Sequence, residues 1–206
     1  EKSHAEDLQN QLFEMAAEND EALMERYFEE GKLTEEELHK GMKLGINNRD
    51  LFPVVCICAK KSIGVSRLME IIIEVAPLPD ERPQRKTEAG KELKMNENEI
   101  PSLFVFKTAM ESHVGEITYF KVMSGKVNES IDLTNINNGA KERLSQLFVT
   151  AGRNRVKVPE IMSGDIGCTV KLKETKQSQT LSLKEAGTQY VPVVFPVSRH
   201  RVAVKA

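Results

Sequence analysis

The first fifty residues place apolar side chains at helical spacing. A helix can start at Asn19 or Asp20, either of which is a good N-cap, and end at Gly31. Its apolar stripe consists of Leu23, Met24, Tyr27 and Phe28. Such a stripe predicts an amphipathic helix that packs on one face. The same spacing already runs through residues 8–15 with no initiator Met before it, so we expect a piece of a longer chain.

A further helix is expected from Thr34. The run Thr34-Glu-Glu-Glu37 is a capping box, in which the Thr34 hydroxyl and the Glu37 carboxylate satisfy each other's free backbone donors. The apolar face that follows is formed by Leu38, Met42 and Ile46. We therefore predict a helical segment over residues 1–50.

The hydrophobic pattern then changes from helical to extended. Phe52 to Ala59 is a continuous apolar run, typical of a strand buried on both faces of a parallel sheet. A polar loop and a helix over residues 65–75 follow, and the residues expected to face inward are Leu68, Met69, Ile72 and Val75. Strand, loop and helix over residues 51–76 predict the last unit of an α/β sheet.

Residues 77–100 are charged and rich in prolines and turn formers, which predicts an interdomain linker. Beyond it, short apolar runs alternate with Gly- and Asn-containing turns. The expected strands are 102–109, 116–124, 131–136, 142–149, 166–172 and 180–183. This pattern predicts a small closed β-barrel over residues 101–186, with a β-sandwich as the competing fold. Extended segments at 190–197 and 202–205 lack a visible partner and predict the start of a truncated third domain over residues 187–206.

Charge divides the chain into two parts. Residues 1–50 hold fourteen Asp and Glu against six Lys and Arg, a net charge of −8, whereas residues 51–206 carry +6. The two parts should prefer different partners. An acidic helical face is either solvated or a docking surface for a protein, and a positive excess is compatible with RNA phosphates.

Three cysteines, Cys56, Cys58 and Cys168, are too few for a disulfide framework and indicate a reducing cytoplasm. Cys56 and Cys58 lie in the apolar run, so we expect buried thiols, with a thiol- or metal-dependent enzyme as the alternative. No apolar stretch is long enough for a membrane helix, and nothing at the start indicates export. The sequence contains no phosphate-binding loop and no recognisable catalytic motif, so no catalytic residue is assigned.

Several segments, in one order, resemble elongation factor G, a translational GTPase. They are 20–27 with 33–37, 52–59 with Gly64-Val65, Val114-Gly115 with 122–125, Lys141-Glu-Arg143, and Ser163-Gly-Asp-Ile166. The resemblance covers nearly the whole chain. It implies the end of the GTP-binding domain, with its helical insertion, followed by the β-barrel second domain.

The resemblance also implies a remnant of the nucleotide site. The fifth guanine-nucleotide motif, usually Ser-Ala, corresponds here to Cys58-Ala59, followed by Lys60. Its backbone N–H groups would read guanine, so Cys in place of Ser need not abolish recognition. GTP and Mg belong to the parent protein, and no cofactor is expected on this part alone.

The partners implied are parts of the ribosome. The acidic helices correspond to a docking site for the ribosomal stalk protein, and the barrel to a domain that rests on small-subunit ribosomal RNA. The candidate RNA-binding cations are Lys141, Arg143, Arg153, Arg155 and Lys157, the last three in one expected loop. A monomer with no membrane partner is expected. The alternatives are a ribosomal protection or release-factor type paralogue and, in another class, a generic protein-binding module.

Overall fold

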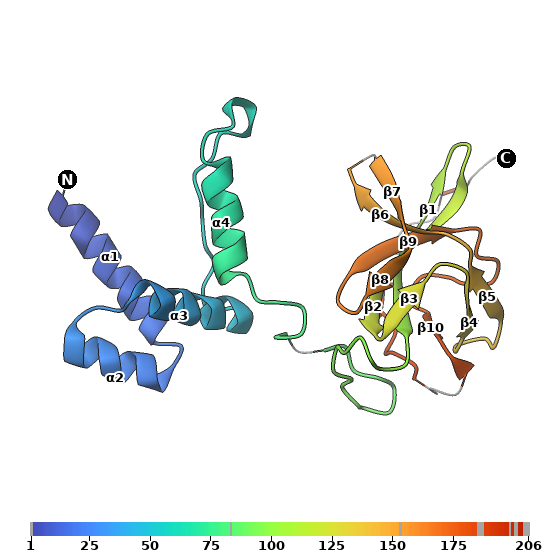
Figure 1. The fold of residues 1–206 in the computed structure, drawn as a ribbon, viewed down its shortest axis with the longest axis horizontal. Coiled ribbons are helices and arrows are strands. Elements are labelled where there is room, and N and C mark those ends of the chain that lie inside the picture. The colour runs from blue at the N-terminus through green and yellow to red at the C-terminus, as the bar shows by residue number, and fades with distance from the viewer. Residues whose placement is uncertain are drawn as a thin grey trace. The chain divides into compact units, whose positions relative to one another are not determined.

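The computed structural model describes residues 2–82, 84–152, 154–184, 188–197, 199, 202 and 203. The chain divides into two compact units, Glu1–Arg82 and Pro83–Ala206. The first unit contains the helices and the second contains the sheets (Figure 1). Within these described residues, no helix is both long and apolar enough to cross a membrane.

The first unit contains four α-helices and a short 3-10 turn. They are α1 (Lys2–Ala17), α2 (Glu21–Glu30), α3 (Glu35–Asn48), η1 (Ala59–Lys61) and α4 (Val65–Val75). The expected helix ends are confirmed. Asp20 caps α2, its carboxylate accepting hydrogen bonds from the N–H groups of Ala22 and Leu23 at 3.1 Å, and Gly31 ends it with φ of 68°.

The core of the first unit lies where α1, α2 and α3 meet. Its buried members are Ala16, Ala17, Leu23 and Leu33. A Cβ at Gly41 would come within 2.4 Å of the Ala16 carbonyl oxygen, so α3 approaches α1 through backbone contact. Phe28, predicted to share the apolar stripe of α2, is instead 78% exposed, because the core is on the side of Leu23 and Tyr27.

The buried strand predicted over residues 52–59 is wrong. Residues 51–57 have no regular secondary structure, and the nearest pairing is a single bridge between Cys58 and Ile63. Phe52 and Val54 are 76% and 92% exposed. A strand requires a neighbour, and in the described part of the chain no strand pairs with this segment.

Helix α4 lies where it was predicted, but its apolar face is only partly covered. Val75 is buried, whereas Met69 and Ile72 remain 53% and 47% exposed. The expectation that Met69 and Ile72 face inward is therefore wrong. Like the segment before it, α4 has no strand to pack against among the described residues of the first unit.

The second unit is an antiparallel β-structure. Its strands are β1 (Ser102–Glu111), β2 (Gly115–Ser124), β3 (Lys126–Asn128), β4 (Ile131–Asn135), β5 (Lys141–Leu144), β6 (Leu147–Ala151), β7 (Asn154–Val158), β8 (Glu160–Met162), β9 (Ile166–Val170) and β10 (Thr180–Ser182). Eight of them form one sheet in the order β5-β4-β10-β1-β2-β9-β6-β7, and β3 pairs with β8. The sheet curls like an incomplete barrel (Figure 1).

The predicted all-β character is confirmed, but closure of the barrel is not observed. No ladder joins the edge strands β5 and β7 in the residues that the structure describes. The expected strand over 142–149 is two strands, because a turn with a hydrogen bond from Ser145 N–H to the Arg143 carbonyl separates β5 from β6. Strands β3, β7 and β8 were not predicted.

The sheet encloses a hydrophobic core, and a smaller buried cluster of Phe104, Met123 and Tyr190 lies apart from it. The buried members of the core are Leu103, Val105, Phe120, Val122, Val127, Leu133, Leu144, Leu147, Ile161 and Leu181. They come from β1–β6, β8 and β10, so residues far apart in the sequence share this core. Side chains alternate along strands such as β5, where Lys141 and Arg143 are exposed while Leu144 and the polar Glu142 are buried.

The segments that flank the sheet pair with each other. Thr87 forms an antiparallel bridge with Tyr190. The Arg85 guanidinium lies 4.0 Å from the centroid of the Phe104 ring and donates a hydrogen bond to the Val191 carbonyl at 2.8 Å. Tyr190 is 1% exposed, so the segment thought to lack a partner contributes to the second unit.

A chain of hydroxyl groups fixes Tyr190. Ser124 Oγ donates to the Ile100 carbonyl at 2.8 Å, and Ser102 Oγ lies 2.6 Å from Ser124 Oγ and 2.7 Å from the Tyr190 hydroxyl. Because the Ser124 proton is already used, Ser102 must donate to Ser124 and Tyr190 to Ser102. Burial raises the pKa of the Tyr190 hydroxyl.

Tyr190→Phe should destabilise the second unit by about 1–2 kcal/mol, because it leaves a buried Ser102 acceptor without its donor. Chemical denaturation followed by far-UV circular dichroism measures the free energy of unfolding. Tyr119→Phe is the matched control, since no hydrogen bond of the Tyr119 hydroxyl is found in the described residues. Equal stability of the two variants would contradict the role of the hydroxyl chain.

Candidate functional site

The residues assigned to guanine recognition form a tight turn. Cys58 and Ile63 exchange two backbone hydrogen bonds, at 2.9 and 3.1 Å, and η1 lies between them. The N–H groups of Ala59 and Lys60 belong to the first turn of η1, and no hydrogen bond within the described chain uses them. Two free backbone donors therefore lie side by side on a small loop.

The cysteines divide differently from the prediction. Cys56 is exposed and Cys58 half-buried, so the expectation of buried thiols is wrong for this pair, because no layer covers their segment. Cys168 is buried, and burial raises its pKa. Among the residues whose placement is described, no group of three or more His, Cys, Asp and Glu could hold a metal ion.

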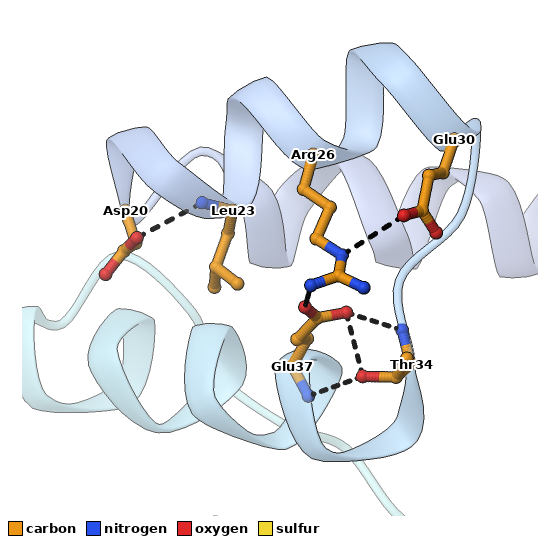
Figure 2. A network of polar contacts seen from close by, with 6 residues as sticks. All are labelled: Asp20, Leu23, Arg26, Glu30, Thr34 and Glu37. Atoms are coloured by element: carbon orange, nitrogen blue, oxygen red, sulfur yellow. Dashed lines mark hydrogen bonds and ion pairs between the residues drawn. The ribbon is translucent and has the colours of Figure 1, made fainter.

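A polar network joins α2 to α3 at the acidic surface. Figure 2 shows the capping box, in which the Glu37 carboxylate accepts hydrogen bonds from the Thr34 N–H at 2.9 Å and the Thr34 hydroxyl at 2.8 Å. Arg26 bridges the helices, with its guanidinium 2.9 Å from Glu37 and 3.4 Å from Glu30. These contacts set how the two acidic helices are held together.

Part of the acidic surface is not neutralised within the chain. Glu21, Glu25 and Glu29 recur every four residues along α2, so they lie on one face of the helix. All three are exposed, and none has an ion pair within the described residues. Phe28, also exposed, lies next to Glu29 in the sequence.

The structure does not bring the predicted RNA-binding cations to one place. Lys141 and Arg143 lie on β5, at one edge of the sheet order, and Arg155 and Lys157 lie on β7 at the other. The loop expected over 152–157 is mostly strand, because residues 151 and 154 close a tight hairpin. Arg153 lies outside the described residues.

Most of these cations already have acidic partners. Arg155 forms an ion pair with Glu111, and Lys157 lies 2.6 Å from Glu129. Arg143 lies 3.5 Å from Asp132. Lys141 is exposed, and no ion pair is found for it within the described chain. Pairing reduces the charge that the paired residues can offer to a phosphate.

Sequence reasoning missed a buried carboxylate beside these cations. Glu142 is 4% exposed, and its carboxylate accepts hydrogen bonds from the N–H groups of Lys173 at 3.2 Å and Glu174 at 2.8 Å, and from the Thr175 hydroxyl at 2.9 Å. The only sequence signal was the alternation of a strand: Glu142 lies two residues before the buried Leu144, so both side chains face the same side of the sheet. A carboxylate at a core-facing position requires buried donors.

The second unit is a compact antiparallel β-domain. A comparison of its sequence with known protein families agrees with this fold. Residues 101–184, which include every strand from β1 to β10, match the family model described as elongation factor G domain 2.

The fold of the chain also resembles a solved structure. The crystal structure of ttk003000868 from Thermus thermophilus covers 95% of this chain with a TM-score of 0.72 and 23% sequence identity. This chain spans 28% of the length of that protein. At this level of identity, the similarity shows a shared fold.

Glu37→Gln should destabilise the first unit at neutral pH, and the effect should fade in acid. The Thr34 backbone N–H and hydroxyl, and then Arg26, hold the Glu37 carboxyl pKa below its ordinary 4.5. A lowered folded-state pKa gives stability that is present above pH 4.5 and lost as pH falls through the folded value. Denaturation of both proteins at several pH values measures the difference.

Glu36→Gln is the control, because it removes a neighbouring carboxylate that has no contact with Thr34. It should cost less at neutral pH than Glu37→Gln. A difference between wild type and Glu37→Gln that stays constant down to about pH 2, well below the ordinary carboxyl pKa, would refute the assignment.

Proposed function

We propose that this chain is part of a translational GTPase related to elongation factor G, which promotes movement of tRNA and mRNA through the ribosome. The observation that carries the proposal is the match of residues 101–184 to elongation factor G domain 2. The fold similarity over 95% of the chain supports extending it to the first unit. In this proposal the chain supplies docking surfaces and no catalytic residue, and the protein acts as a monomer in the cytoplasm.

GTP with Mg is the proposed cofactor of the whole protein, where it would supply the free energy of hydrolysis. The residues of this chain could contact only the guanine base of GTP. The free N–H groups of Ala59 and Lys60 could donate to a guanine oxygen, and the bonds between Cys58 and Ile63 hold their turn. Cys58 would act only through its backbone, which holds the turn. The Ser that is usual at this position would therefore not be required.

The two units suit different parts of the ribosome. The exposed carboxylates of α2 would attract the basic face of the ribosomal stalk protein, giving fast association more than high affinity. The second unit, with its positive excess, would rest on small-subunit ribosomal RNA. Opposite charge on the two units lets each select its own partner.

Replacing Glu21, Glu25 and Glu29 by Gln should weaken binding of the chain to purified stalk protein about three- to tenfold at low salt. The reason is loss of three unneutralised charges from one helix face. Surface plasmon resonance at two salt concentrations measures the affinity. A control variant with Gln at Glu97, Glu99 and Glu116, three exposed carboxylates of the second unit, should bind like wild type. Equal losses in both variants would rule out docking through α2.

The chain alone should bind GTP with a dissociation constant weaker than about 1 mM, because phosphate contacts supply most of the affinity for nucleotides and a phosphate loop is absent from the sequence. Isothermal titration calorimetry tests this. Micromolar affinity would overturn the view that residues 58–60 provide only a guanine contact.

A further inference from the structure

The loop that joins β9 to β10 is held in place by hydrogen bonds over residues 173–176, 178 and 179. The Glu142 carboxylate binds the N–H groups of Lys173 and Glu174 and the Thr175 hydroxyl. The Asn138 side-chain amide donates to the Glu174 carbonyl at 2.9 Å. These contacts connect residues 173–175 to β5 and to the turn that precedes it.

The network continues inward. Thr175 Oγ1 also accepts from the Asn135 side-chain amide at 3.3 Å, and that amide donates to Gln179 Oε1 at 2.9 Å. Gln179 Oε1 in turn accepts the Lys176 N–H at 2.6 Å. Asn135 is fully buried, and a buried polar network is stable only in the one arrangement that satisfies its members. The network therefore holds the backbone over residues 173–176, directly after Lys171 and Leu172.

This fixed loop carries three lysines at its surface. Lys171, Lys173 and Lys176 are all exposed, and no ion pair is found for any of them within the described chain. Glu174 is the one exposed carboxylate between them. In contrast to the paired cations of β5 and β7, these ammonium groups are available to an external anion without breaking an internal contact.

We propose that the loop over residues 171–176 is the main phosphate-binding element of the second unit, contacting the backbone of small-subunit ribosomal RNA. Glu142 is its positioning residue: it touches no phosphate but holds the backbone at Lys173 and Glu174, in the middle of the loop. A preordered loop loses less conformational entropy on binding than a mobile one. This inference rests on the proposed ribosomal function and names the contact within it.

The first experiment replaces Lys171, Lys173 and Lys176 by Ala in the full chain. Binding to purified small ribosomal subunits is measured by cosedimentation over a series of KCl concentrations. Wild-type binding should weaken with salt, and the triple variant should bind at least about tenfold more weakly, with a slope of log affinity against log salt shallower by about 2–3.

A control variant removes the same charge from lysines that are already engaged. Lys86 pairs with Glu92, Lys126 pairs with Glu160, and Lys107 lies 5.5 Å from the centroid of the Tyr119 ring. Alanine at these three positions should reduce binding by less than about threefold. If the control and the loop variant lose equal affinity, net charge and not the loop is responsible, and the proposal fails.

The positioning role has its own test. Glu142→Gln keeps the side-chain shape but replaces one acceptor oxygen by a donor that faces the N–H groups of Lys173 and Glu174. Hydrogen exchange of these two amides should accelerate at least about tenfold, and subunit binding should weaken although every lysine is retained. Faster exchange with wild-type binding would overturn the role of Glu142, and so would unchanged exchange.

Competition separates RNA from protein as the partner. Protein-free small-subunit rRNA should displace wild-type chain from the subunits, and failure to displace it would assign the loop to a ribosomal protein, against the proposal. If wild-type chain does not bind subunits at all, the ribosomal function itself fails. If it binds and the loop variant binds equally well, only the inference about the loop is lost.

Discussion

A β-strand is stable only when its backbone N–H and C=O groups pair with a neighbour, and this requirement separates the two units. In the second unit each strand finds its neighbours within the chain, including pairs such as β1 and β10 that lie far apart in the sequence. The flanking segments meet the same requirement through the bridge between Thr87 and Tyr190. In the first unit, residues 51–57 have strand-like composition but no neighbour among the described residues, and they remain irregular.

Two buried polar systems hold segments outside the strands of the second unit, one at Tyr190 and the other in the loop after β9. The hydroxyl chain from Tyr190 through Ser102 to Ser124 has only one consistent direction of donation, because Ser124 donates to a carbonyl. The Glu142 carboxylate similarly accepts donors from a loop that comes late in the sequence. In each system, buried polar groups replace their hydrogen bonds to water by hydrogen bonds to specific partners. The free-energy cost of burial is small when every group has a partner and large when one partner is missing.

Local sequence signals predicted the helices well and the sheet in part. Capping at Asp20, Thr34 and Gly31 depends on neighbours within four residues, so it could be identified directly. The short strands β3, β7 and β8 have three to five residues and no apolar run, and their pairing depends on partners elsewhere in the chain. The failure at 52–59 has the same origin: composition favoured a buried strand, but burial depends on layers that no local pattern specifies.

The candidate sites show the same division more sharply. The sequence identifies the cations but not their acidic partners. From the sequence alone, Arg155 and Lys157 are therefore as good candidates for RNA binding as Lys141. The ion pairs with Glu111 and Glu129 depend on which strands lie side by side. They therefore cannot be predicted from the spacing of residues along the sequence. The same argument applies in reverse to the lysines after β9, which did not stand out as a motif. What distinguishes these lysines is the Glu142 carboxylate, which binds the backbone at Lys173 and Glu174. Within the described residues, their ammonium groups have no ion pair. In the proposed phosphate contact, the burial of one charge therefore matters as much as the exposure of the others.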